Sequence, residues 1–319
     1  MLNAWIKKFY GSGNIIFVIS GFVITNLIFN KSKNFSLSEY LYDRIMRLWV
    51  VLIPSIIFSI CLYMYLKTYA VGIINGDLRY IINSGPSEND SKITIYLILG
   101  NIFFLQEILV QTFSINAPLW SLSYEFWYYL LFPVILIFLN KIENYNKPTF
   151  RFICLILFIL LLMFLPLKII LYFLIWLCGS LIFLFRNISF IYIKTHLIIS
   201  VTLLLISIFA LKINFLNLNN FILELFIIIS FSYFILVFLK LKSKILTSIF
   251  FKKLSDLSYS LYLFHFPLVL LLSSYIGNNK FDLNFLNFLL FIVVTILIIF
   301  IVYFFGFYLK EILIQLKEY

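Results

Sequence analysis

The sequence is short of charged residues. Only 12% of its 319 residues are Asp, Glu, Lys or Arg, whereas 64% are hydrophobic and the mean hydropathy is +1.09. Soluble domains carry about a quarter charged residues. A chain of this composition cannot cover its surface with polar groups, so a soluble globular protein is excluded and lipid must be its solvent. Because apolar stretches run nearly end to end, the sequence predicts one membrane-embedded domain over residues 1–319, without a separate soluble domain.

Several other features are scarce or missing. The three cysteines, Cys61, Cys154 and Cys178, lie in apolar stretches without pairing or metal-ligand spacing, so neither a disulfide nor a metal is expected. No internal repeat is visible, which disfavours the inverted halves of many transporters. The first apolar stretch lacks a small-residue cleavage site and is predicted to be a retained span. The 24 basic residues lie mostly between apolar segments, which favours cytoplasmic loops over nucleic-acid binding.

Long apolar windows predict a polytopic, all-α transmembrane bundle. About 20 apolar residues in a helix suffice to cross a hydrocarbon core of about 30 Å. The windows of this kind lie at 14–30, 45–66, 118–140, 151–167, 169–185, 193–211, 220–240, 257–276 and 284–309, with a shorter one at 94–110.

The distribution of basic residues decides whether the 94–110 segment crosses the membrane. If it does not, most of the 24 basic residues fall on the same side as Arg44 and Arg47. If it does, the 141–151 and 241–253 clusters fall on the opposite side. The sequence therefore predicts nine spans in a bacterial inner membrane, with the N-terminus outside, the C-terminus inside and a re-entrant or outer 94–110 segment. Residues 67–93 then form an external loop, which is either a lid or acceptor-binding loop or a solvated connector.

Two arginines stand at the inner end of the second predicted span. Arg44 and Arg47 are three residues apart, so their guanidinium groups share one helix face. Forked and permanently charged donors suit a phosphate-rich ligand. The alternative is a membrane anchor, in which both side chains reach out to the lipid headgroups.

The segment 116–125 places polar groups at the start of an apolar helix. Pro118 suits the first helical turn, where a missing N–H costs nothing. Ser121 and Glu125 are four residues apart and face the same way, and Glu125 lies about 10 Å below the outer boundary. A carboxylate at that depth needs a partner or a proton. It is either a structural hydrogen-bond hub or a catalytic group.

The segment 257–267 carries a polar stripe on an otherwise apolar helix. Ser258, Tyr262 and His265 follow a spacing of four and then three residues, which puts them on one face. Pro267 releases the carbonyl of Leu263 from its helical hydrogen bond and kinks the helix. His265 lies about 12 Å from the inner boundary. It is either a functional group or a core histidine bonded to a neighbouring helix.

Taken together, these segments resemble the acyltransferase 3 family of integral-membrane acyltransferases, many of which O-acetylate bacterial surface polysaccharides. Four blocks match in order: Phe17–Thr25 ("FFxxSGFxIT"), Tyr42–Arg47 with Pro54 ("YxxRxxRxxP"), Trp120–Glu125 ("WSLSxE") and Leu257–Pro267 ("LSYxxYLxHxP"). In addition, Glu311 resembles the family's Glu after the last helix. The resemblance covers nearly the whole chain. Its specific part is the order of the "WSLSxE" and "YLxHxP" blocks within such a hydropathy profile. From position alone, Glu311 is expected in an interfacial ion pair, and His196, near Lys194 at the membrane interface, is expected to be solvated.

The resemblance implies transfer of an acyl group, expected to be acetyl, from cytosolic acyl-CoA to a hydroxyl of a carbohydrate or lipid-linked glycan, with no metal. It assigns the donor's phosphates to Arg44 and Arg47. The catalytic candidates are His265, Glu125, Ser121 and Tyr262, and the substrate-binding candidates are Trp120, Ser123, Ser258 and Tyr259. Glu125 and His265 differ in depth by only about 8 Å, so they could line one chamber if their helices are neighbours.

One departure from the family keeps other interpretations open. Family members usually begin with an extra span that carries an Arg and a His thought to serve in catalysis. This chain has no Arg before Arg44 and no His before His196. Either the true start lies upstream, or this is a shortened member with impaired activity. The alternatives are a transporter or flippase for a polysaccharide intermediate, with Glu125 and His265 as a proton relay, or a non-catalytic remnant or partner subunit. The oligomeric state is open.

Overall fold

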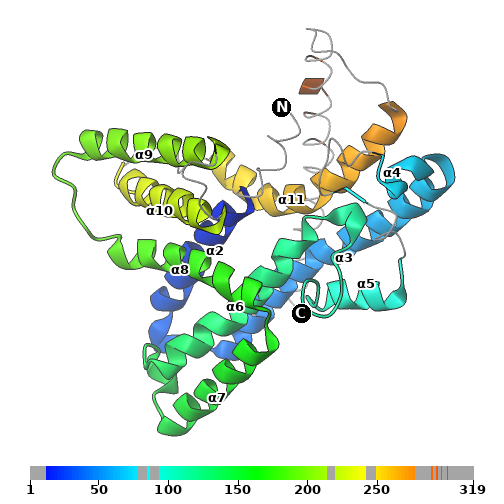
Figure 1. Ribbon diagram of the computed structural model, residues 1–319. Coiled ribbons are helices and arrows are strands. Elements are labelled where there is room, and N and C mark those ends of the chain that lie inside the picture. The colour runs from blue at the N-terminus through cyan, green and yellow to red at the C-terminus, as the bar shows by residue number, and fades with distance from the viewer. Residues whose placement is uncertain are drawn as a thin grey trace. The chain divides into compact units, whose positions relative to one another are not determined.

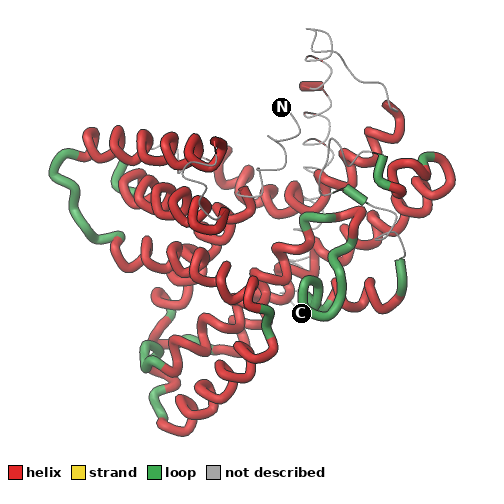
Figure 2. The backbone as a smooth tube through the Cα atoms, in the orientation of Figure 1, coloured by secondary structure: helices red, strands yellow, loops and turns green. Residues whose placement is uncertain are grey.

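The protein is helical throughout the part that the computed structural model describes, residues 12–77, 85–86, 93–213, 220–241 and 249–276 and positions 289, 292, 293, 296 and 300. The described α-helices are α2 (Ser12–Asn30), α3 (Leu37–Tyr69), α4 (Val71–Asn75), α5 (Ile95–Ile102), α6 (Leu119–Phe138), α7 (Pro148–Phe164), α8 (Leu167–Phe185), α9 (Ile193–Ile213), α10 (Asn220–Phe238) and α11 (Ile249–Ile276) (Figure 1). Three 3-10 turns used below are η2 (Ser32–Asn34), η4 (Ser114–Asn116) and η5 (Glu143–Tyr145). No strand occurs among these residues (Figure 2), which confirms the all-α prediction.

The helices follow the predicted spans closely. Four of them, α3, α6, α8 and α9, are long and apolar enough to cross a membrane, and four further apolar helices are shorter. The 94–110 segment forms only the eight-residue α5, about 12 Å long, which confirms that it is no spanning helix. Most of the predicted span 284–309, and Glu311, lie outside the described residues, and the count of nine spans stays a prediction.

The chain divides into two compact units. Unit 1 comprises residues 1–41 and 124–243, and unit 2 comprises residues 42–123 and 244–319. Two of the three boundaries between them fall inside the sequences of α3 and α6. That residues 1–319 act as one domain stays a prediction.

Unit 1 is built around the packing of α2 against α8. A Cβ atom on Gly21 would collide with the backbone oxygen of Trp176, and one on Gly179 would collide with the backbone oxygen of Val18. The two backbones can therefore approach closely only because both positions are glycine, the usual way in which helices associate in lipid. The Oγ1 of Thr25 and the Oγ of Ser180 lie 2.8 Å apart and form a hydrogen bond between the same two helices.

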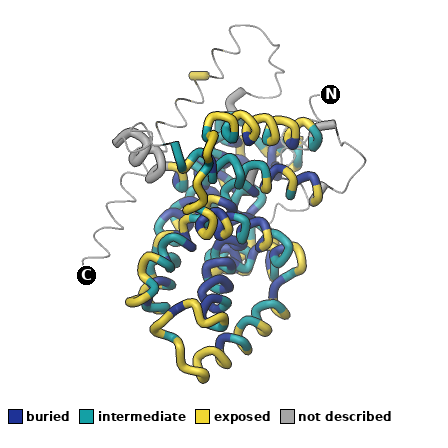
Figure 3. The backbone as a smooth tube through the Cα atoms, turned by 90° about the vertical axis from the view of Figure 1, so that its left-hand side faces the viewer, coloured by how far each residue is buried: buried dark blue, intermediate teal, exposed yellow. Residues whose placement is uncertain are grey.

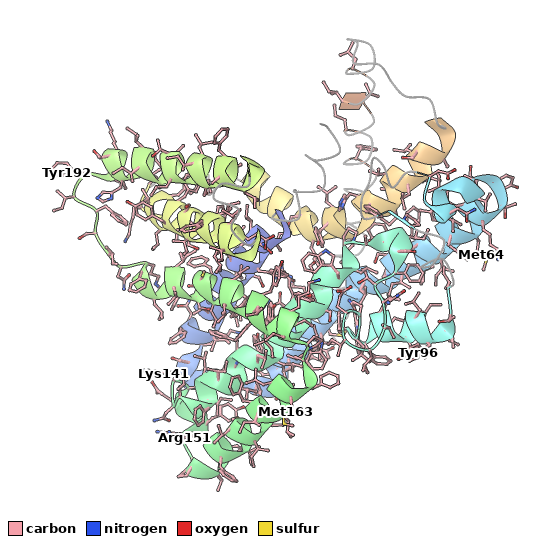
Figure 4. The ribbon with its side chains drawn as sticks, viewed as in Figure 1. Met64, Tyr96, Lys141, Arg151, Met163 and Tyr192 are labelled. Carbon is pink, nitrogen blue, oxygen red and sulfur yellow. The ribbon has the colours of Figure 1, made fainter. Side chains whose placement is uncertain are left out.

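Basic residues gather at one end of unit 1. There η2 packs on η5, and the Nη1 of Arg186 donates to the Oδ1 of Asn26 at 2.9 Å. Lys141 and Arg151 lie at the turn between α6 and α7 (Figure 4), where the Nε of Arg151 donates to the carbonyl of Phe138 at 3.2 Å. The C-terminal ends of α2, α6 and α8 therefore meet at the basic end of this unit.

Unit 2 holds the segment 93–123 against α3 through polar side chains. The indole of Trp49 on α3 donates to the carbonyl of Ile102 at 2.9 Å. Within the segment itself, the buried Gln106 donates to the carbonyl of Leu119 at 2.9 Å. Further along, η4 packs on α11, and the rings of Phe58 and Phe264 lie 5.8 Å apart. These contacts place the start of α6 beside the middle of α11.

Many positions along the helices are exposed (Figure 3), and a large share of them carry apolar side chains. On α9, for example, Ile198 is 65% exposed and Ile206 is 63% exposed. Side chains of this kind along a helix of 21 residues require an apolar solvent. The protein is an integral membrane protein.

Candidate functional site

Ser121 and Tyr262 form the centre of the polar cluster in unit 2. The Oγ of Ser121 and the Oη of Tyr262 are 2.7 Å apart, and each also lies 3.2 Å from the carbonyl oxygen of Pro118. Because that carbonyl only accepts, one hydroxyl donates to it and the other donates within the pair. Two residues from different predicted motifs are thus brought together by the fold.

His265 lies one turn further along α11 with a defined tautomer. Its Nδ1 is 2.8 Å from the carbonyl oxygen of Tyr262 and 3.1 Å from that of Leu261. Since both neighbours are acceptors, Nδ1 carries the hydrogen, and Nε2 is the basic nitrogen of the neutral ring. No described residue hydrogen-bonds to Nε2. The half-buried imidazole can therefore accept a proton from a ligand.

Asn116 receives the carbonyl that Pro267 leaves without a helical donor. Helix α11 continues through Pro267, and the Nδ2 of Asn116 donates to the oxygen of Leu263 at 3.0 Å. The sequence predicts the freed carbonyl but gives no sign of which side chain would satisfy it. That partner lies far away in sequence, at the end of η4.

The four predicted substrate-binding residues differ in their surroundings. The fully buried Ser123 donates to the carbonyl of Phe104 at 2.7 Å, and the hydroxyl of Tyr259 donates to the carbonyl of Leu48 at 3.3 Å. Trp120 is half-buried and Ser258 is exposed. Ser123 and Tyr259 thus have backbone partners, and the role of all four residues in substrate binding stays a prediction.

Arg44 and Arg47 lie in the first turns of α3, which begins at Leu37 rather than at the predicted 45. Arg47 is exposed and Arg44 is half-buried, with its Nε buried and without a hydrogen-bond partner. Neither guanidinium forms an ion pair with a described residue. Two uncompensated, permanently charged donors three residues apart can bind an anion.

Glu125 lies in unit 1 and is a member of a hydrogen-bonded chain. The hydroxyl of Tyr129 donates to its Oε2 at 3.3 Å and lies 3.4 Å from the Oγ of Ser20, to which the indole of Trp176 donates at 3.3 Å. The buried carboxylate therefore has a hydrogen-bond donor within the protein, and both alternatives, a structural hub and a catalytic group, stay open. Its catalytic role, and the chamber shared with His265, stay predictions.

A second buried carboxylate, Glu224, was missed by the sequence analysis. It is 9% exposed and accepts at Oε2 from the Nδ2 of Asn14 at 3.0 Å and from the hydroxyl of Tyr172 at 3.2 Å. The depth argument used for Glu125 would have found it, because Glu224 also stands within the first turns of an apolar window. Phe17 and Tyr124 contact the Tyr172 ring, with centroids 6.3 and 5.9 Å away.

His196 differs from its expected solvated state. It is half-buried in unit 1, where its Nδ1 lies 2.7 Å from the Oη of Tyr233 and its ring lies 4.8 Å from that of Phe190. The aromatic rings of Phe190 and Tyr233 therefore shield it partly from water. Among the described residues, no three His, Cys, Asp or Glu side chains are grouped so that they could hold a metal ion.

The fold and these clusters define a class: integral membrane proteins in which ionisable side chains are held inside apolar helices. Comparison with protein families narrows it, because the family described as "Acyltransferase domain", acyltransferase 3, matches residues 15–304. The chain belongs to this family of membrane acyltransferases, which confirms the resemblance carried by the four sequence blocks. No curated protein and no solved structure matches the chain.

Proposed function

We propose that the protein transfers an acetyl or related acyl group from acyl-CoA to a hydroxyl of a cell-surface carbohydrate, free or lipid-linked. In this reaction the acceptor oxygen bonds to the thioester carbonyl carbon, the carbon–sulfur bond breaks, and the hydroxyl proton passes to the departing thiolate. The products are an ester and coenzyme A. Membership of the acyltransferase family supports the reaction type.

His265 is the proposed base, and its hydrogen bonding is the observation that carries the proposal. With Nδ1–H held by the carbonyls of Tyr262 and Leu261, Nε2 presents a lone pair for the acceptor proton. The imidazolium formed can then return this proton to the coenzyme A sulfur. The basicity of Nε2 is a property that a purely structural histidine would not need.

The hydroxyl pair of Ser121 and Tyr262 is proposed to stabilise the negative charge that develops on the thioester oxygen. One of the two protons is already shared within the pair, so a small rotation can redirect it toward an oxyanion. Trp120, Ser123, Ser258 and Tyr259 are proposed to contact the substrates. Glu125 is proposed as a further catalytic group, its carboxylate oriented by Tyr129.

Arg44 and Arg47 are proposed to bind the phosphates of the donor on the cytoplasmic side. The gathering of basic residues at one end of unit 1 supports an inner-membrane orientation with that end inside. Two exposed positions on either side of α8 allow a test of this orientation. Leu167, at the start of the helix, is 69% exposed, and Tyr192, in the segment after its end, is 73% exposed. In intact cells, an impermeant maleimide should label Leu167→Cys but not Tyr192→Cys.

The function is tested with purified protein in lipid nanodiscs by following thiol release from acetyl-CoA. His265→Gln should lower the turnover about 100-fold, in line with the loss of a general base, while the dissociation constant of coenzyme A stays within twofold. His196→Gln is the matched control and should keep wild-type turnover. Wild-type turnover by His265→Gln would overturn the assigned base. Wild-type protein that neither binds nor cleaves acetyl-CoA would overturn acyl transfer itself.

A further inference from the structure

The carbonyl of Leu263 presents a problem inside a membrane helix. Residue 267 would normally donate its N–H to this oxygen, but Pro267 has no N–H. An unsatisfied backbone group in an apolar environment is costly. The fold meets this need with the side chain of Asn116, which is 0% exposed and donates from Nδ2 at 3.0 Å.

The orientation of the Asn116 amide is determined by its neighbours. Leu263 offers only a carbonyl oxygen, so the nitrogen of the amide must face it. The same nitrogen lies 3.3 Å from the Oγ of Ser59, whose own proton goes to the carbonyl of Ser55 at 2.7 Å. Both N–H groups of Asn116 are therefore used, and they join η4 to α3 and α11 at once.

This bridge lies directly beside the proposed catalytic groups. Tyr262 and His265 flank Leu263 on α11, and the carbonyl of Tyr262 holds the Nδ1 of His265. Two residues after Asn116, the carbonyl of Pro118 receives the hydroxyl of Tyr262. The segments 116–118 and 262–263 are thus connected at two points, one through Asn116 and one through Tyr262.

We propose that Asn116 is a positioning residue: its amide replaces the donor missing at Pro267 and so holds Tyr262 against Ser121 and His265 in its catalytic orientation. The inference rests on the proposed function for its catalytic part only. The replacement of a helical donor by a side chain is independent of any activity.

The replacement itself is tested by a double-mutant cycle on thermal unfolding in detergent. Asn116→Ala should lower the midpoint in the wild-type background. In a Pro267→Ala background, residue 267 regains an N–H for the Leu263 carbonyl, and Asn116→Ala should cost less than half as much. Asn101→Ala is the matched control: Asn101 is equally buried in unit 2 but donates to Leu97 and Gln111. Its cost should be the same in both backgrounds.

An equal cost of Asn116→Ala in both backgrounds would overturn the proposal. Should the alanine variant not purify, Asn116→Ser in both backgrounds gives the same comparison, because a shorter side chain with a single donor weakens the bridge.

The catalytic part is tested by steady-state thiol release from acetyl-CoA. Asn116→Ala should lower kcat about tenfold or more with KM within twofold, since orientation rather than binding is lost. Pro267→Ala should restore most of this loss. Unchanged kcat in Asn116→Ala, beside an inactive His265→Gln, would overturn the positioning role alone. Wild-type turnover by His265→Gln would instead refute the proposed function, and the unfolding cycle would remain valid.

Discussion

The side chains of Asn14 and Glu224 form a hydrogen bond of 3.0 Å that joins α2 to α10 within unit 1. They are 1% and 9% exposed, and Tyr172 on α8 donates to the same carboxylate oxygen. Burying a carboxyl group in an apolar bundle is unfavourable unless donors surround it. Three helices are therefore held together at a point where each polar group depends on the others.

Removing the carboxyl group of Glu224 should destabilise the protein. Glu224→Leu leaves the donors of Asn14 and Tyr172 without their acceptor, which should cost about 2 kcal/mol or more. Glu224→Gln keeps an acceptor oxygen and should cost less than half of that. Thermal unfolding in detergent measures both, with Glu143→Leu, at an exposed position in η5, as the control expected to be neutral.

Adding a methyl group at the α2–α8 seam should disrupt unit 1. Gly21→Ala and Gly179→Ala each place a Cβ against the backbone of the opposite helix, and such overpacking costs about 1–3 kcal/mol. Both variants should unfold at lower temperature than the wild type. Val23→Ala, on an exposed face of α2, should not. A Gly179→Ala variant as stable as the wild type would contradict the close approach of the two helices.

Loss of either arginine on α3 should weaken binding of the donor. A charge-assisted hydrogen bond to phosphate contributes about 1.5–3 kcal/mol, so Arg47→Ala or Arg44→Ala should raise the dissociation constant of coenzyme A about tenfold or more. Raising the salt concentration should reduce the difference from wild type. Arg151→Ala, which removes an arginine from unit 1, controls for net charge. An equal loss in this control would indicate non-specific attraction instead.

Removing one hydroxyl of the Ser121–Tyr262 pair should slow the chemical step. Tyr262→Phe should lower kcat about 100-fold, the range found for loss of an oxyanion donor, with little change in KM. Ser121→Ala should have a smaller effect, because Tyr262 keeps Pro118 as a partner. If the two hydroxyls act together, the double variant should be no slower than Tyr262→Phe alone.

Most helices could be predicted from the sequence because length and hydropathy are local properties. The exceptions are informative. Helix α3 begins at Leu37, ahead of the apolar window, because the polar turns around Arg44 are helical without being hydrophobic. The 94–110 segment is apolar enough for a span, but its one short helix ends at Ile102, and two residues later Phe104 has a φ of 58°. Side chains in unit 2, Trp49 and Gln106 among them, hold its irregular backbone.

Only part of the candidate site could be predicted from the sequence. Spacing placed Tyr262 and His265 on one helix face, and the proline rule identified the freed carbonyl of Leu263. Neither argument could identify Asn116 as the donor to the Leu263 carbonyl or Ser121 as the partner of Tyr262. The two residues of each pair are more than 100 positions apart in the chain. Glu224 was not predicted, although the depth argument applied to the carboxylate of Glu125 applies equally to it.

The sequence by itself determined that the protein lies in lipid, where most helices run and which family it resembles. Hydrophobic length, helical periodicity and short motifs each depend only on residues that are close together in the chain. Only the tertiary structure decided which polar groups satisfy one another: Asn14 with Glu224, Asn116 with Leu263, and Ser121 with Tyr262. In lipid, a buried polar atom cannot hydrogen-bond to water, so its partner must come from the protein, and in these three pairs it comes from another segment of the chain. That choice depends on how the helices pack, and no local pattern contains it.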